Sequence, residues 1–474
     1  MKKSVGSLAL LLATLMVGKP CASRAQDFFR DLGTSRSSGG IGPVVPSDYT
    51  YENASPSGLR PLRPGQDLSV TEAQEEEDKF NFALGNFRFG AALGVGIEFN
   101  DNIKLSQNDR ISDFIFRPVL NLDSEWRLSD LNTLRFNIGL SYAKYFQHSE
   151  FDTDGVLISP TSEIAFTMYT GPVKWTVRDR GSYQEDTYDI PDVSGVPQYK
   201  RWENQAGLDA DWAINQSFDL TVGYDHYNLW TTGNSGQQDL TGFQLQDRAI
   251  DTIFVKPSWQ MNPAIKVGVN ASYSFIDFKD PARSDGEGLL AGPFIEWQIS
   301  EYTNLYLEGG YQSLTFDHAS NFEDAAINQL GLSATDAAAV RASVQDSEDS
   351  HSYYVKFEIN NRPSEFFKHR LSFSKTSEVG FLSDFITLYN VEYDADWKVT
   401  EKLELGPTVF YEHYTTSGSL GEKADRIGAA IGLRYHIRNN LTLGLDYRYI
   451  WKNSNLDGLD YYQNLVFLSL YYKF

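Results

Sequence analysis

Apolar and polar residues alternate along the chain from Phe87 to its last residue. In the first run, the side chains at every second position between Phe87 and Phe99 are apolar or small, while Arg88 and Glu98 lie on the opposite parity. A period of two is typical of a β-strand with one apolar face. The pattern recurs in about eighteen runs. The others cover residues 114–126, 134–142, 158–168, 173–183, 202–212, 218–230, 253–261, 265–275, 289–299, 305–311, 353–359, 367–373, 385–397, 403–411, 427–437, 441–451 and 462–474.

The connections between these runs alternate between short and long. Tight turns are expected at 128–130, 170–172, 215–217, 262–263, 300–302, 362–364, 400–402 and 438–440. Longer polar connections fall between them, such as 185–200, 231–247 and 316–350. Short turns on one rim and long loops on the other are typical of outer-membrane barrels. We therefore predict an all-β fold, a transmembrane antiparallel β-barrel of about eighteen strands with both termini on the periplasmic side.

The tryptophans lie where such a barrel meets the membrane surface. All nine fall on the apolar parity of their strand and near a strand end. Indole rings favour the lipid–water interface, so these residues predict two girdles around the barrel, in contact with outer-membrane lipid and lipopolysaccharide. The predicted girdle residues are Trp126, Trp175, Trp202, Trp212, Trp230, Trp259, Trp297, Trp397 and Trp451.

The last strand ends with Tyr472 and Phe474 on its apolar face. A terminal aromatic residue in this setting resembles the signal by which the barrel-assembly machinery recognises outer-membrane proteins. These two residues are therefore the predicted assembly signal, and that machinery is a predicted partner.

The opposite parity of the strands predicts the residues that line the lumen. Acidic and basic side chains alternate there, so neighbouring strands can pair charges across the wall. Two interpretations stay open: an ion-selective, water-filled pore, or charges that neutralise one another and brace the wall. A transverse field between early arginines and late carboxylates is a further hypothesis. The lumen candidates are Arg117, Arg135, Arg178, Arg180, Glu392, Asp394, Asp396, Arg434 and Arg448.

The long connection Phe316–Ser350 contains two sequences typical of helix starts. Asn321 and Ser333 are each followed three residues later by an acid, Asp324 and Asp336. Two short helices here would either constrict the mouth or cap the outside, and we favour the external cap.

The N-terminal part divides into two predicted segments. Residues 1–25 combine Lys2 and Lys3 with an apolar run and a Ser23-Arg24-Ala25 cleavage site, as in a signal peptide. Residues 26–85 are rich in Gly, Pro and acids and predict a flexible periplasmic tail. Residues 86–474 are then the barrel, located in the bacterial outer membrane.

Charge and motifs narrow the function. The formal net charge of −22 would repel phosphate, so a nucleic-acid partner is not expected. The seven histidines are scattered, and no zinc motif, nucleophile elbow or phosphate loop appears. We predict no enzyme activity, no cofactor and no metal site.

The first hairpin resembles a known family. It reads Gly-Ile-Glu-Phe-Asn-Asp-Asn-Ile at 96–103, then Ser-Asp-Phe at 112–114 before Pro118. This is similar to the β-barrel porin families associated with capsule and exopolysaccharide secretion, although Asn100 stands where those families carry Asp. The resemblance implies an exit conduit for a polysaccharide, with periplasmic polysaccharide-export proteins as partners. The alternatives are a general diffusion porin and a structural or adhesive barrel with a blocked lumen.

Overall fold

The structure is a computed structural model and describes residues 80–160, 162–185, 191–232, 246–280, 283–317, 349–381, 383–418 and 421–474. The alternating runs form antiparallel strands of one sheet, because each has an apolar and a polar face. Eighteen of them build the wall. The wall strands are β2 (Phe87–Asn100), β3 (Asp113–Ser129), β4 (Asn132–Ser141), β7 (Glu163–Thr170), β8 (Val173–Gln184), β9 (Arg201–Ala213), β10 (Phe218–Thr231), β11 (Arg248–Asn262), β12 (Ile265–Phe278), β13 (Gly286–Ser300), β14 (Thr303–Phe316), β15 (Ser350–Ser364), β16 (Phe367–Val379), β17 (Phe385–Thr400), β18 (Leu403–Thr416), β19 (Lys423–Arg438), β20 (Leu441–Ser454) and β21 (Tyr461–Lys473).

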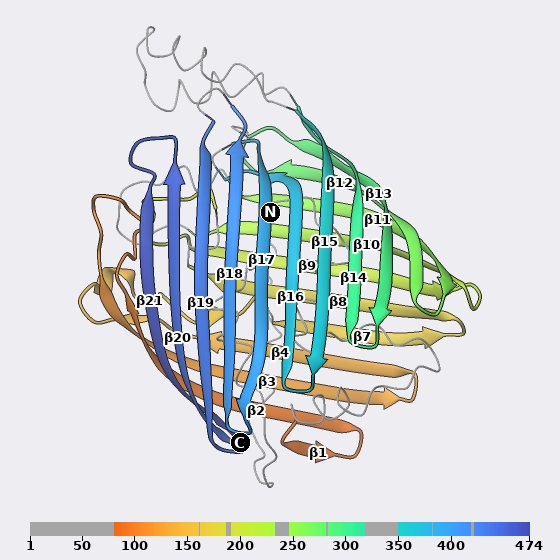
Figure 1. Ribbon diagram of the computed structural model, residues 1–474, viewed down its shortest axis with the longest axis horizontal. Helices are drawn as coiled ribbons and strands as arrows, with labels where there is room; N and C mark the ends of the chain where they lie inside the picture. Colours follow the sequence, from red (N-terminus) through yellow and green to blue (C-terminus); the bar gives the residue numbers. More distant parts are fainter. Residues whose placement is uncertain are drawn as a thin grey trace, which may run out of the picture.

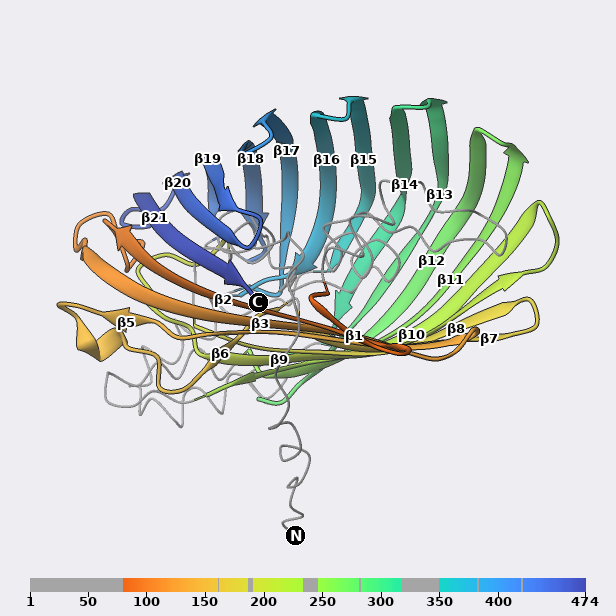
Figure 2. The same cartoon turned by 90° about the horizontal axis from the view of Figure 1, so that it is seen from below.

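The sheet closes on itself. The last strand, β21, pairs antiparallel with β2 over the register Ala92↔Lys473 to Asn100↔Leu465. Figure 2 shows the two strands side by side, at the join between the blue and orange parts of the wall. Closure matters because unpaired strand edges are not tolerated in hydrocarbon. The predicted closed antiparallel barrel of eighteen strands is confirmed.

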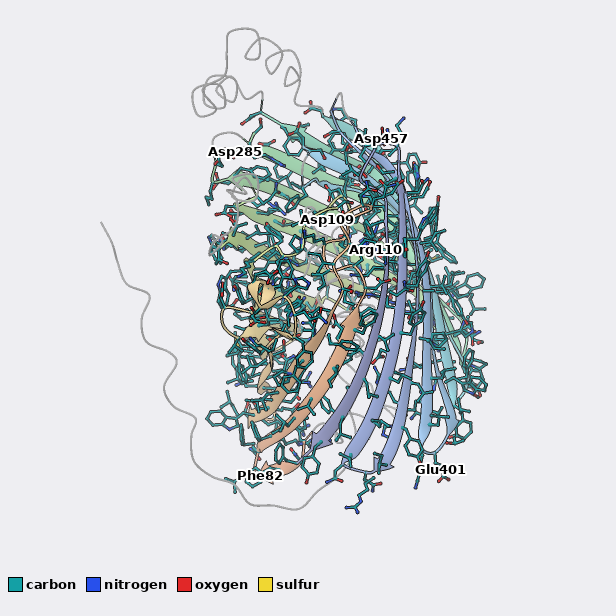
Figure 3. The ribbon with its side chains drawn as sticks, turned by 90° about the vertical axis from the view of Figure 1, so that its left-hand side faces the viewer. Phe82, Asp109, Arg110, Asp285, Glu401 and Asp457 are labelled. Carbon is teal, nitrogen blue, oxygen red and sulfur yellow. The ribbon has the colours of Figure 1, made fainter. Side chains whose placement is uncertain are left out.

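The two rims of the barrel differ as predicted. Short turns join alternate strand pairs, as at Glu365 and Phe366 between β15 and β16. Figure 3 shows Glu401, in another short turn, at the same end as Phe82. Asp285 and Asp457, both in connections of the other rim, lie at the opposite end.

The wall has one apolar face and one polar face. On β2, the outward side chains of Leu93 and Ile97 are 45% and 46% exposed, whereas the inward Glu98 is 5% exposed. The same alternation holds around the barrel, so the outer surface presents an apolar band to lipid. Among the described residues, no helix is long and apolar enough to cross a bilayer.

One predicted strand is interrupted, and the connection before it is irregular. The predicted run 158–168 divides into β6 (Leu157–Ile158) and β7, and the preceding strand ends at Ser141, before the short strand β5 (Lys144–Tyr145) and a 3-10 turn at Ser149–Phe151. The reason is local: Gly139 donates its N–H to the Ser162 hydroxyl and accepts the Ser159 N–H, which replaces regular pairing. A further short strand, β1 (Phe82–Leu84), pairs with β2 inside the predicted tail segment.

Candidate functional site in the barrel lumen

The buried charges of the lumen are paired between neighbouring strands. Arg178 on β8 contacts Asp209 on β9 and Asp225 on β10, with 2.6 Å between its Nη2 and the Asp225 Oδ1. All three side chains are almost fully buried. Gly207 lies beneath them, and a Cβ there would stand 2.4 Å from the Asp225 carboxylate. This cluster therefore braces three adjacent strands.

Three more predicted lumen residues make close, buried contacts. Arg117 donates to Glu98 at 2.8 Å, between β3 and β2. Glu392 and Asp394, both on β17, accept from the Arg370 guanidinium at 3.1 and 2.8 Å.

Each of the remaining candidates also contacts a neighbouring strand, although the Arg135 and Lys368 side chains are about half exposed and the contact of Arg448 is with a neutral amide. The contacts are Arg434 with Asp446 at 2.6 Å, Arg135 with Glu125 at 3.2 Å, Arg180 with Glu163 at 3.3 Å, Lys368 with Asp396 at 3.4 Å, and Arg448 with Gln463 at 3.4 Å. The early arginines and the late carboxylates are thus each paired with their own strand neighbours rather than with one another. This pattern favours the bracing interpretation over a strong transverse field.

One connection crosses the inside of the barrel at its long-loop rim. Residues 191–200, here called the crossing segment, join β8 to β9 and contact the far wall. Lys452 of β20 donates to the Ser194 hydroxyl at 2.8 Å, and the Gly195 N–H donates to the Leu105 carbonyl at 3.0 Å. The segment therefore spans the barrel from β9 to β20 and the β2–β3 connection.

A second connection meets the crossing segment inside the barrel. The latch turn, defined as Gly380, Phe381, Ser383 and Asp384, joins β16 to β17. The Phe381 N–H donates to the Asp192 carboxylate at 2.7 Å. Its ring meets the Tyr199 ring edge to face, with centroids 5.0 Å apart.

Side chains from the β10–β11 and β12–β13 connections hold the latch turn from the other side. Arg283 donates to the carbonyls of Phe381 and Ser383 at 3.3 and 3.0 Å, and the Gln246 amide donates to the Phe381 carbonyl. The latch turn thus reaches from β16 across to the beginning of β11.

An apolar cluster surrounds this meeting point. Its members come from the inner faces of five strands and from both connections: Val193, Tyr199, Tyr227, Leu229, Ile250, Ile276, Phe278, Leu314, Phe316, Val379 and Phe381. Each is at most 6% exposed. Buried charges lie at the same level, such as Lys452 with Glu422 and Arg201 with Glu203, so the cluster is one apolar part of a mixed interior.

Burial shifts the ionisation of groups in these connections. Burial raises the pKa of Asp192, since the charged carboxylate loses solvent. The Phe381 N–H and Lys452 oppose the shift, and Glu422 adds to it, but burial outweighs them. Burial lowers the pKa of Arg283 to about 10, which leaves it protonated at neutral pH. It also raises the pKa of the Tyr199 phenol.

The predicted girdle residues point outward. Eight of the nine tryptophans are 37–55% exposed, and Trp175 is partly exposed with its indole N–H bonded to the Thr170 hydroxyl at 2.8 Å. Trp202 and Trp230 are cross-strand partners on β9 and β10. Their contact with the membrane interface stays a prediction, with this orientation in its favour.

The predicted assembly signal also lies on the outer face. Tyr472 and Phe474 are 41% and 43% exposed, and their rings meet edge to face with centroids 5.2 Å apart. The Phe474 N–H donates to the Ala91 carbonyl at 3.2 Å, so the chain end is fixed to β2. Recognition by an assembly machinery stays a prediction.

The sequence analysis placed 185–200 among the long connections, where the structure has it, but it did not predict that residues 191–200 contact the latch turn. The two helices predicted in 316–350, for which an external cap was favoured, lie outside the described residues. Residues 1–79, with the predicted signal peptide and most of the tail, lie outside them too. One residue could have indicated that β16 leaves the regular wall. Lys375 is charged, yet it lies at a position where the alternation of β16 predicts an apolar, outward side chain. No group of three metal-ligating side chains is found in the described part of the chain.

Comparison with known proteins gives a family match at the C-terminal end. Residues 370–474, which hold β17–β21 and most of β16, match the family model described as "Putative beta-barrel porin 2". The comparison with curated proteins found no match.

Solved structures of porin-like barrels are similar at low identity. OccAB4 of Acinetobacter baumannii is 12% identical with a TM-score of 0.44, and the alignment covers 82% of this chain and 98% of that one. OpdK of Pseudomonas aeruginosa, crystallised with vanillate, is 10% identical with a TM-score of 0.42, covering 81% and 99%. OpdQ of Pseudomonas aeruginosa is 9% identical with a TM-score of 0.43, covering 82% and 100%.

The closed wall, its apolar outer face and its polar inner face define an outer-membrane β-barrel of the porin-like channel class. The resemblance of this chain to a β-barrel porin family is confirmed by the match at its C-terminal strands. Its location is the outer membrane of a Gram-negative bacterium.

Proposed function

We propose that the protein is a gated channel, closed by the crossing segment and the latch turn, that serves as the exit conduit of an exopolysaccharide export system. The observation that carries the gate is the contact between Phe381, Asp192 and Tyr199 inside the barrel. Two connections from different parts of the wall meet there, and the apolar cluster around them excludes water. Separating them would open the lumen without breaking any pairing in the wall.

The nature of the cargo does not follow from the gate contact. The resemblance of the first hairpin to porin families of capsule and exopolysaccharide secretion supports a polysaccharide. Periplasmic polysaccharide-export proteins would deliver it and drive the gate open. A general diffusion porin is the second candidate, and it is favoured by the mostly neutralised charges of the wall, which suit small uncharged solutes.

Single-channel conductance in planar bilayers tests the gate. The Phe381→Ala variant removes the ring that packs on Tyr199, so we expect its mean conductance to rise at least threefold over the wild type. Phe366→Ala is the matched control, because Phe366 is 55% exposed in a short turn and should change nothing. Equal conductance of Phe381→Ala and wild type would contradict the gate.

Oligosaccharides added to the open Phe381→Ala channel test the cargo. A conduit for glycans should show blocking events whose duration grows with the length of the oligosaccharide. A diffusion porin should show brief events that vanish once the sugar exceeds the size of the pore. Absence of any conductance in both the wild type and Phe381→Ala would favour a structural or adhesive barrel.

A further inference from the structure

The wall has one seam where backbone pairing stops early. Strands β14 and β15 pair up to Leu314↔Ser350, and β16 and β17 pair up to Val379↔Phe385. Between them, β15 and β16 pair only as far as Val355↔Lys375. Residues 350–354 and 376–379 therefore face each other without a ladder, and the two strands diverge toward the long-loop rim (Figure 1).

Side chains close this seam in place of backbone hydrogen bonds. The Gln312 amide, from β14, donates to the Ser377 carbonyl at 2.7 Å and accepts the Ser377 N–H at 2.9 Å. The Ser350 hydroxyl donates to the Ser377 hydroxyl at 3.1 Å. The unpaired edge of β16 is thus satisfied by one side chain that reaches past β15.

The divergence follows from the latch turn. The end of β16 bends into the lumen, because Phe381 at its tip is held by Asp192, Gln246 and Arg283. Val379 lies at a position whose equivalents nearer the short turn, such as Leu371, face lipid. It is nevertheless fully buried and belongs to the inner apolar cluster. The seam and the latch turn are therefore two consequences of one bend.

An unusual cation lies in the seam. Lys375 shares the outward parity of Leu371, yet it is only 5% exposed. Its ammonium donates to the Ser352 hydroxyl at 2.5 Å and the Tyr353 carbonyl at 3.0 Å, and it lies 3.4 Å from the Tyr353 ring centroid. Among the described residues, Lys375 forms no ion pair with a carboxylate.

The seam lies at the height of the outer leaflet. Phe367 lies at the short turn, and Lys375 lies about 20 Å further along the barrel axis. This height follows from a rise of ~3.3 Å per residue and a strand tilt of ~40° from the axis. The apolar band of such barrels is about 25 Å tall. The gap therefore begins near the top of the acyl chains and continues into the headgroup region, where open backbone edges are less costly than in the bilayer core.

We propose that the β15–β16 seam is a lateral port that admits an anionic amphiphile of the outer leaflet to the apolar cluster in the lumen. The Lys375 ammonium binds the anionic headgroup at the entrance. Gln312 and Ser350 close the port by hydrogen bonds that can be broken without disturbing any ladder. The acyl chain then contacts Leu314 and Phe316, which line the inner side of β14 next to the seam.

Photolabelling in reconstituted vesicles tests this port. The probe is phosphatidylglycerol with a diazirine at the end of one acyl chain, and labelled peptides are identified by mass spectrometry. A Ser350→Cys/Ser377→Cys variant, in a Cys21→Ser background, lets the port be locked by a disulfide. We expect label on Leu314, Phe316 or Phe381 in the reduced protein, and at least a fivefold loss after oxidation.

Two controls separate the port from other effects of the disulfide. The Thr252→Cys/Ser274→Cys pair, with hydroxyls 2.8 Å apart in the continuous β11–β12 ladder, should label equally in both redox states. Lys375→Gln should reduce inner labelling by phosphatidylglycerol severalfold and leave labelling by a phosphatidylcholine probe unchanged. Label confined to the lipid face, or inner label that ignores oxidation, would overturn the proposal. Conductance of Phe381→Ala tests the gate independently, so either idea can fail alone.

Discussion

The wall of the barrel and the connections at its long-loop rim are held together in different ways. In the wall, charges such as Arg178 and Asp225 pair between neighbouring strands, and each contact is local. Toward the long-loop rim, Phe381 and Tyr199 bring together connections from opposite parts of the barrel. The first arrangement holds the wall together, whereas the second joins two connections inside it and is the gate that we propose. Stability and gating should therefore respond to different substitutions.

The largest effect is expected from breaking the buried charge cluster. Arg178→Met leaves two buried carboxylates without a cation, which should cost about 3–5 kcal/mol of unfolding free energy. Urea titration in phospholipid vesicles measures it. Arg135→Met is the matched control, because the Arg135 side chain is 53% exposed and its pair should contribute less than about 1 kcal/mol. Similar losses in both variants would contradict the distinction between buried and exposed pairs.

A smaller loss is expected from crowding the same cluster. Gly207→Ala places a methyl 2.4 Å from the Asp225 carboxylate and 2.8 Å from the Arg178 guanidinium carbon. Overpacking of this kind costs about 1–3 kcal/mol. Gly181→Ala, with nothing within 4 Å of its added Cβ, should be neutral in the same titration. An unchanged Gly207→Ala midpoint would show that the cluster can relax.

The connections at the long-loop rim should respond to pH. The pKa of Asp192 is raised in the closed position, so closure is favoured by protonation. That stabilisation is fully present below the ordinary carboxyl pKa and is lost as the pH rises through the raised one. We therefore expect a lower open probability at pH 4 than at pH 7.

Substitution at Asp192 sharpens that test. In Asp192→Asn the neutral amide can still accept the Phe381 N–H, so the closed state should persist at both pH values. Asp109→Asn, at a carboxylate 77% exposed, should keep the wild-type response. If Asp192→Asn still responds to pH like the wild type, another group controls the gate.

The smallest effect is expected on the outer face. Trp259→Ala removes an indole that is 55% exposed toward lipid, and the loss of unfolding free energy should be about 1 kcal/mol or less. The depth of Trp259 is measured by the difference between wild type and variant in the quenching of tryptophan fluorescence by lipids brominated at defined depths. Quenching strongest by deeply placed bromine would contradict the predicted interface girdle.

The strands of the wall could be predicted from the sequence, whereas the contact between the crossing segment and the latch turn could not. An alternation such as Phe87–Phe99 depends only on local sequence, because it reflects the two faces of one strand. Since strands in a membrane cannot leave an edge unpaired, the strands must then close into a barrel. The strand 367–373 was predicted too short, because the bend of β16 beyond Lys375 depends on Arg283 and Asp192, which are remote in sequence. The pairing of each lumen charge with an adjacent strand was open from the sequence, since parity alone does not choose between a charged pore and a braced wall.

The contact between the first and last wall strands also constrains how the protein is made. The register joins Ala92 to Lys473, so the final pairing couples the first and last strands of the barrel. Such distant contacts form late, because they carry the largest loss of chain entropy. Until they form, two bare strand edges would face lipid at a cost of several kcal/mol for each unsatisfied group. A nascent chain that stops before β21 therefore has no stable resting state in the bilayer, and insertion must be completed as one cooperative event.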